Sequence, residues 1–150
     1  MNYANYKCVM VLDEDLPQGI LCNTSAIMGI TLGKYIASTV GENVVDQDNF
    51  LHLGIIQFPV PILKASKEKI KEIREMLYED KYQELVVVDF SDVAQSCNDY
   101  PDFIELMKNT KHQDITYFGI AMCGAKKLVN KLTGSLPLSV SYTHLTLPTN

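Results

Sequence analysis

Strand-like and helix-like segments alternate along this chain, and this order limits the fold more than any other feature. Apolar, often β-branched runs predict strands at residues 7–12, 54–63, 85–90 and 115–123. Apolar residues at helical spacing predict helices at residues 23–38, 66–78, 100–108 and 125–132. The β-α-β-α-β-α-β-α order predicts one α/β domain whose sheet is covered by helices on both faces.

Three segments allow more detailed predictions. Residues 85–90, LVVVDF, are apolar enough for a central parallel strand buried on both faces. Residues 54–63 contain Pro59 and Pro61, which cannot donate to a ladder, so we expect an edge strand or a strand entering a fixed loop. In the first helix, Asn23 or Thr24 is the expected N-cap. Gly29 and Gly33 share one helix face and are expected to pack closely on the sheet.

Composition excludes several classes of protein. A chain of 150 residues, 47% hydrophobic and 21% charged, suits one globular domain with its own core. There is no apolar run of about 20 residues, as a membrane helix needs, and no basic-then-apolar start typical of a secretory signal. We therefore expect a cytoplasmic protein without a membrane partner. The net charge of −5 disfavours a broad nucleic-acid surface.

The cysteines and histidines give no metal-binding pattern. Cys8, Cys22, Cys97 and Cys123 form no C-x-x-C pair, and the three histidines lie far apart in the sequence. We therefore predict no metal site and no cofactor. Four reduced thiols, mostly buried, are the expected state of the cysteines.

The last segment breaks the pattern of the domain. Residues 140–150, VSYTHLTLPTN, are uncharged and resemble the conceptual translation of a transposase end-adapter used in preparing sequencing libraries. We interpret them as a non-native tail and expect residues 1–139 to form a single domain. A native C-terminal strand is the alternative interpretation.

Long motifs along the chain resemble one bacterial family. The motifs are KCVMVLDEDLPQG, ITLGK, QFPVPILKA, LVVVDFSDVAQSC and KKLVNKLTGSLPL, and they span nearly all of residues 7–138. In this order they resemble the family catalogued as domain of unknown function 2000. That family is similar to a distant branch of the type II peptidyl-tRNA hydrolase superfamily. The resemblance implies a three-layer α/β/α domain with a mixed four-stranded sheet and an antiparallel last strand.

The superfamily resemblance depends on three places. Lys7 matches a lysine that begins the first strand of type II hydrolases, and Asp89 matches an aspartate after a central strand. Residues 131–136, KLTGSL, are similar to the K-V-T-G-x-L that follows their last helix. The glycine- and lysine-rich turn before their first helix is not kept, because residues 17–25 contain neither lysine nor histidine.

Candidate site residues follow from the expected sheet. Ligands of open α/β sheets bind at the carboxyl ends of parallel strands, where Asp13, Asn23 and Asp89 are expected to gather. Asp89 could act as a general base and Lys7 could bind a phosphate or carboxylate. Taken singly, each also suits a structural role: a helix cap for Asn23, a helix-start acid for Asp89 and a solvent-reaching lysine for Lys7.

Two further ligand-binding candidates are Gln57 and Lys126. Gln57 precedes the two prolines and could belong to a rigid pocket wall, or the prolines could only protect a sheet edge. Lys126 belongs to a small basic patch on the last helix that could receive a phosphate-bearing ligand or simply face solvent.

Two functions remain open from the sequence. The first is a binding module for a small anionic ligand that keeps the fold without the full hydrolase site. The alternative is a hydrolase acting on peptidyl-tRNA or a related ester, with Asp89 and Lys7 in the site. The acidic composition disfavours tRNA as a partner, and a homodimer is a further candidate assembly.

Overall fold

A four-stranded mixed sheet forms the centre of the domain in the computed structural model, which describes residues 2–139. Its strands, in spatial order, are β4 (Ile62–Ala65), β1 (Tyr6–Asp13), β6 (Tyr117–Ala125) and β5 (Val86–Ser91). β1 is parallel to β4, whereas β6 is antiparallel to both of its neighbours. The mixed four-stranded sheet and the antiparallel last strand are confirmed. The interpretation of residues 140–150 concerns residues outside the described range.

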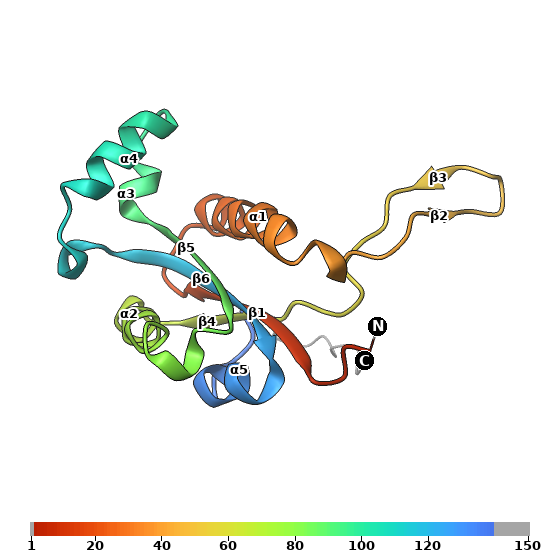
Figure 1. Ribbon diagram of the computed structural model, residues 1–150. Coiled ribbons are helices and arrows are strands. Elements are labelled where there is room, and N and C mark those ends of the chain that lie inside the picture. Colours follow the sequence, from red (N-terminus) through yellow and green to blue (C-terminus); the bar gives the residue numbers. More distant parts are fainter. Residues whose placement is uncertain (1, 140–150) are drawn as a thin grey trace, which may run out of the picture.

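Helices cover both faces of this sheet (Figure 1). α1 (Gln18–Tyr35) lies on one face, and α2 (Lys67–Met76) and α5 (Lys126–Thr133) lie on the other. α3 (Asp92–Gln95) and α4 (Tyr100–Lys108) follow the carboxyl end of β5. Short 3₁₀ turns complete the order: η1 (Ala37–Thr39), η2 (Asp80–Tyr82) and η3 (His112–Asp114). The expected α/β architecture with three layers is therefore present.

The alternation of β1 divides the interior into two cores. Val9 and Val11 point to α2 and α5, where Ile70, Ile73 and Val129 are almost completely buried. Cys8, Met10 and Leu12 point to α1, against Met28 and Leu32. Both cores use side chains of β1 and β6, which explains why the sequences of these two strands are apolar at consecutive positions.

The position predicted for residues 85–90 is wrong. β5 pairs with β6 alone and antiparallel to it, so it is an edge strand and not a central parallel one. Val86 to Asp89 are accordingly only half-buried. The continuous apolar run suggested a central strand because α1 and α3 pack against β5 and give it apolar surroundings.

The start of the first helix also differs from the prediction. α1 begins at Gln18 with Pro17 at the N-cap position, so Asn23 is an exposed residue inside the helix and caps nothing. Gly29 does approach the sheet, since an added Cβ would lie 3.8 Å from Met10 Cε. Gly33 has open space around it, and its expected packing on the sheet is wrong.

Of the strand predicted at residues 54–63, only Ile62 and Leu63 belong to β4, but β4 is an edge strand as expected, and the structure shows how that edge is closed. The strand itself begins after the prolines, at Ile62. Lys64 N donates to Pro137 O at 3.0 Å, and Ser139 N donates to Ile62 O at 2.7 Å. The segment after α5 therefore lies antiparallel along β4 and satisfies its outer backbone groups.

The two strand cysteines are paired. Cys8 and Cys123 face each other in the β1–β6 register and form a disulfide, whereas Cys22 and Cys97 are free. The prediction of four reduced thiols is therefore wrong for Cys8 and Cys123. Their 115-residue separation in sequence hides a contact that the antiparallel register creates.

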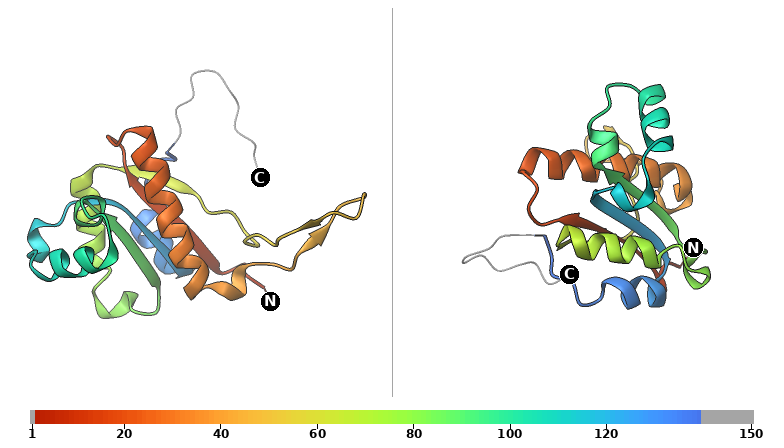
Figure 2. Two further views of the ribbon diagram at one scale, coloured as in Figure 1. Left: turned by 90° about the horizontal axis from the view of Figure 1, so that it is seen from above. Right: turned by 90° about the vertical axis from the view of Figure 1, so that its left-hand side faces the viewer.

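A two-stranded ribbon, absent from the sequence prediction, extends from the end of α1. It consists of β2 (Val44–Val45) and β3 (Leu51–His52), and we call residues 41–55 the arm. Figures 1 and 2 show that the arm projects away from the rest of the domain.

Among residues 2–139, no helix combines the length and apolar character needed to cross a bilayer. Within the same range, no three His, Cys, Asp or Glu residues are grouped as metal ligands would be.

Candidate functional site

A cavity of about 460 Å³ lies where α1, β5, α3 and α4 meet, and we call it the α4 cavity. Its volume falls within the range of roughly 300–1,000 Å³ that is typical of small-molecule sites. The wall is mainly apolar and aromatic; its carbon-rich members are Ile27, Val88, Phe90, Ala94, Tyr100 and Phe103. Tyr100 and Phe103 meet edge to face at 5.4 Å, one helical turn apart on α4.

The polar groups of the α4 cavity come from α1 and from the segment that joins α3 to α4. They are Thr31, Cys97, Asn98 and Asp99, together with Asp89 from β5. Asp99 is held in place because its Oδ1 accepts a hydrogen bond from Asp102 N at 2.9 Å and so caps α4. The Asp89 carboxylate points away from this cavity toward Arg74, which leaves Asp99 as the carboxylate of the lining, and the lining contains no lysine, arginine or histidine. Its electrostatics therefore favour a neutral or cationic ligand over an anionic one.

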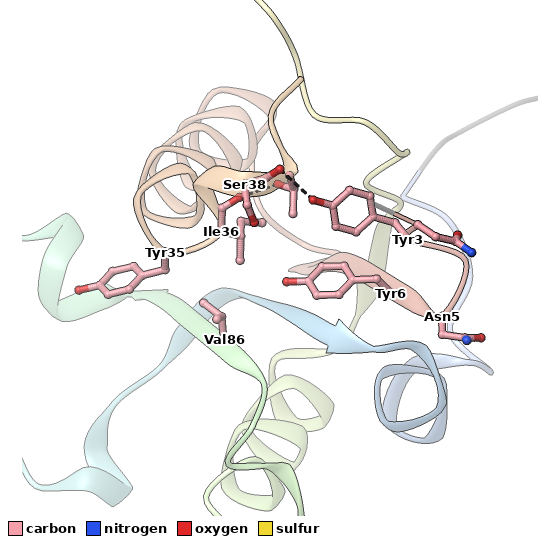
Figure 3. Close-up of a pocket in the computed structure, with 9 residues that line it drawn as sticks. Tyr3, Asn5, Tyr6, Tyr35, Ile36, Ser38 and Val86 are labelled. Atoms are coloured by element: carbon pink, nitrogen blue, oxygen red, sulfur yellow. Dashed lines mark hydrogen bonds between the residues drawn. The ribbon is translucent and has the colours of Figure 1, made fainter. Parts of the chain in front are cut away.

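A second cavity of about 340 Å³ lies at the other end of α1, and Figure 3 shows its residues. Tyr3, Tyr6 and Tyr35 surround it, together with Ile36 and Val86. The Tyr3 hydroxyl donates to Ser38 O at 2.8 Å, which ties the N-terminal segment to η1. Burial, and next the neighbouring Tyr3, raise the pKa of the Tyr6 hydroxyl, so it stays a neutral hydrogen-bond donor.

Asp89, proposed as a general base, is held in an ion pair. Its Oδ2 accepts a hydrogen bond from Arg74 Nε at 2.8 Å, and both side chains are largely buried. Arg74 also stacks on Tyr78, with 4.1 Å from its Cζ to the ring centre. Burial, and next the charge of Asp89, raise the pKa of the nearby Tyr117 hydroxyl. This arrangement of partners stabilises α2 on the sheet and leaves Asp89 committed to Arg74.

Lys7, its proposed catalytic partner, lies at the opposite end of the sheet. Lys7 pairs with Gly124 and Asp89 pairs with Ile120, four residues apart along β6. At about 3.3 Å per residue, this separates the two rows by roughly 13 Å along the strand. Lys7 Nζ donates to Asn130 Oδ1 of α5 at 2.6 Å. The structure therefore does not bring the two proposed catalytic side chains together.

Asp13 and Asp89 do lie near the same end of the strands, since Leu12 and Phe90 both pair with Gly119. Asp13 is buried, and its Oδ1 accepts a hydrogen bond from Asp15 N at 3.0 Å, as in a turn that closes β1. Asn23 lies on α1 and faces solvent, on the other side of the sheet from the Asp13 side chain. The expected three-residue cluster is not formed.

The last two candidates have structural partners. The Gln57 side chain donates to Ser38 O and Thr39 O at 3.4 and 3.2 Å, so it fastens the base of the arm. Lys126 begins α5 with an exposed side chain, and its backbone N donates to Asn5 O at 2.8 Å. Neither residue lines the α4 cavity or the second cavity, which Tyr3, Tyr6 and Tyr35 surround.

Sequence reasoning missed the α4 cavity, although a signal was present. α4 is amphipathic, yet none of its side chains is fully buried in a core. Tyr100 and Phe103 sit at helical spacing on the segment that was predicted as a short helix. An aromatic pair on a helix too short to complete a core would have indicated a pocket wall.

Comparisons with known proteins agree on the fold. The family model described as "Protein of unknown function (DUF2000)" matches residues 6–139. A solved structure, that of the protein of unknown function Atu0240 from Agrobacterium tumefaciens str. C58, superimposes with a TM-score of 0.79 at 14% identity. The match covers 89% of this chain and 97% of the other. No curated protein matches at a significant level. At this identity the structural match shows a shared fold.

Proposed function

Because the chain belongs to the DUF2000 family, we propose a function from its own geometry: it is a small-molecule binding module that uses the α4 cavity and performs no chemistry there. The single observation that carries this proposal is the mainly apolar cavity of about 460 Å³ with a few fixed polar groups. The ligand class that fits is a small aromatic or aliphatic molecule with one or two hydrogen-bonding groups, neutral or positively charged.

The state of the proposed catalytic residues supports binding over catalysis. A general base must reach the proton that it removes, within about 3 Å or through one water. Asp89 is instead paired with Arg74, and Lys7 is paired with Asn130 at the far end of the sheet. The anionic ligand predicted from the sequence remains a prediction, and the lining of the α4 cavity disfavours it at this site.

The finer assignment to the type II peptidyl-tRNA hydrolase superfamily, with hydrolysis of an ester, also remains a prediction. It is tested by cleavage of N-blocked aminoacyl-tRNA. We expect the wild type and Asp89→Ala to show equal rates at the uncatalysed background. A wild-type rate above background that is lost in Asp89→Ala would replace the binding proposal with the hydrolase.

The binding proposal is tested with three matched probes: phenylpropanol, phenylpropylamine and phenylpropionate. They share one apolar group and differ in charge. We expect the alcohol and the amine to shift the backbone NMR signals of Thr31, Val88 and Phe103, and the acid to bind more weakly. Equal shifts for all three probes, or shifts located elsewhere, would contradict the assignment of the site.

A matched pair of variants provides the control. Ala94→Leu adds volume inside the α4 cavity, whereas Ala37→Leu adds the same volume at an exposed position on η1. Ala94→Leu is expected to abolish binding and Ala37→Leu to leave it unchanged, with both variants melting near the wild-type temperature without probe. Undiminished binding by Ala94→Leu would exclude this cavity.

A further inference from the structure

The arm exposes an unusual amount of apolar surface. Six large side chains within residues 41–55 are between 59 and 79% exposed: Val44, Val45, Phe50, Leu51, Leu53 and Ile55. Contiguous exposed apolar surface on a folded domain marks a place where another surface binds. The ribbon has only two residue pairs of its own, and a ribbon of this size is marginally stable in water.

The tip of the arm nevertheless has a defined structure. Asp46 Oδ1 accepts hydrogen bonds from Asp48 N at 2.9 Å and from Phe50 N at 3.0 Å, and Oδ2 contacts His52 Nε2 at 2.8 Å. Asn49 adopts a left-handed conformation with φ of 69°, which asparagine tolerates. Local sequence therefore specifies this turn without help from the rest of the domain.

The base of the arm is fixed as well. A Cβ on Gly54 would lie 1.9 Å from Gly41 O, so glycine is required where the two backbones meet. Gly41 N donates to Ile55 O, and Gln57 N donates to Thr39 O, both at 2.9 Å. The arm is thus held in one direction from the domain (Figure 2), and its apolar side chains are exposed to solvent.

The same chain carries a surface that suits such an arm. The outer side of α1 includes Ala26, Ile30 and Gly33, with Ile30 77% exposed and open space around Gly33. Lys34 is the only charged residue of α1, and the helix contains no acidic residue. A helix without a charged side is normally covered on all sides. By contrast, α2 carries lysines and glutamates on its outer side, and α5 carries lysines.

We propose that the chain forms a two-fold symmetric dimer in which the arm of each copy lies on the outer side of α1 of the other. Fully burying one such side chain removes on the order of 100 Å² from water. Strand alternation places Val45, Leu51, Leu53 and Ile55 on one face of the ribbon, and Val44 and Phe50 on the other. Four side chains at about two-thirds exposure bury roughly 270 Å² per arm. Two arms with the surfaces they cover then bury roughly 1,100 Å², above the area of about 1,000 Å² that a specific interface needs.

The alternatives are weaker on the same grounds. One arm on an unrelated protein would bury about half of that area, which is the size of a nonspecific contact. Arm-to-arm pairing would bring Glu42, Asp46 and Asp48 of two copies together, with no lysine or arginine on the arm to compensate. α1 of a second copy avoids this repulsion, because its one charged residue is the exposed Lys34.

The proposal is tested by the mass of the protein in solution, measured by light scattering over a dilution series. The wild type is expected to have the mass of two chains. Leu53→Ser on the arm and Ile30→Glu on α1 should each raise the dissociation constant by at least about a hundred-fold, because each dimer carries the substitution twice. Both positions are more than three-quarters exposed, so each variant should fold and melt as a monomer.

Ile104→Glu is the matched control, because Ile104 is 56% exposed on α4 and belongs to neither surface. It is expected to stay dimeric. A wild type with the mass of one chain would overturn the proposal. A dimer that survives both Leu53→Ser and Ile30→Glu, or that is broken by Leu53→Ser alone, would also overturn it, since the arm would then not lie on α1.

Discussion

The two faces of the sheet differ in how completely the chain covers them. On one face, α2 and α5 enclose a core of sixteen buried residues; α2 places lysines and glutamates outward, and α5 places lysines outward. On the other face, a single helix covers nine buried residues, both cavities open beside it, and its outer side has almost no charge. The first face is thus the more completely packed one, and both binding surfaces that we propose lie on the second. Substitutions on the two faces should therefore have different consequences.

The largest difference is expected for isoleucines on opposite faces. Ile73 is 1% exposed in the α2 and α5 core, and Ile73→Ala should lower the free energy of unfolding by roughly 2–5 kcal/mol. Ile27 is half-buried beside the α4 cavity. Ile27→Ala should lower the free energy of unfolding by only about 1 kcal/mol, because the side chain already borders empty space. Urea denaturation measures both values. Equal losses would mean that the two faces are equally packed.

A pair of glycines sharpens the comparison between the inside and the outside of α1. A Cβ on Gly119 would lie 2.7 Å from Leu12 Cδ2 and 2.9 Å from Thr24 Cγ2, so Gly119→Ala should cost about 1–3 kcal/mol. Gly33→Ala meets no atom within 4 Å and should stabilise the monomer by up to about 1 kcal/mol. Thermal unfolding of dilute protein tests whether Gly119→Ala lowers the melting temperature and Gly33→Ala raises it. Stabilisation by Gly119→Ala would show that β6 and α1 are less closely packed than described.

The ion pair at β5 provides a third comparison. Asp89→Asn leaves Arg74, whose side chain is 12% exposed, without its counterion, and should cost roughly 1–3 kcal/mol. Lys7→Met removes only a hydrogen bond to Asn130 and should cost about 1 kcal/mol or less. Chemical denaturation of both variants measures the two losses in the free energy of unfolding. A Lys7→Met loss larger than that of Asp89→Asn would mean that Lys7 has a role not described by its contact with Asn130.

The smallest effect concerns the pH response of the arm. The hydrogen bond with His52, and next the bond from Phe50 N, lower the pKa of Asp46 below its usual 3.8. A lowered pKa in the folded state means that the turn is fully stabilised above the usual value and loses this contribution only as the pH falls through the lowered one. The NMR signal of the Asp46 side-chain carboxyl carbon should therefore titrate with a midpoint below 3.8. A midpoint at or above 3.8 would contradict the lowered pKa.

Much of the fold follows from local patterns that the tertiary structure only orients. Ser66 accepts from Lys69 N at 3.1 Å and starts α2 where it was predicted, and Pro101 lies in the first turn of α4. Both signals act within one helical turn, so they do not depend on distant residues. The candidate site was much less predictable, because Lys7 meets a partner on α5 that is 123 residues away and Asp89 meets one on α2 that is 15 residues away.

By itself, the sequence determined the α/β class, the alternating elements, the antiparallel character of the last strand through family resemblance, and the edge position of the Pro59–Pro61 region. Only the tertiary structure decided the strand order, which put β5 at the edge and joined Cys8 to Cys123. It also decided that Asp89 pairs with Arg74 and that an apolar arm leaves the domain beside α1. The physical reason is that hydrophobic period and capping report on neighbours within a few residues, whereas register, ion pairing and exposure depend on which distant segments pack together.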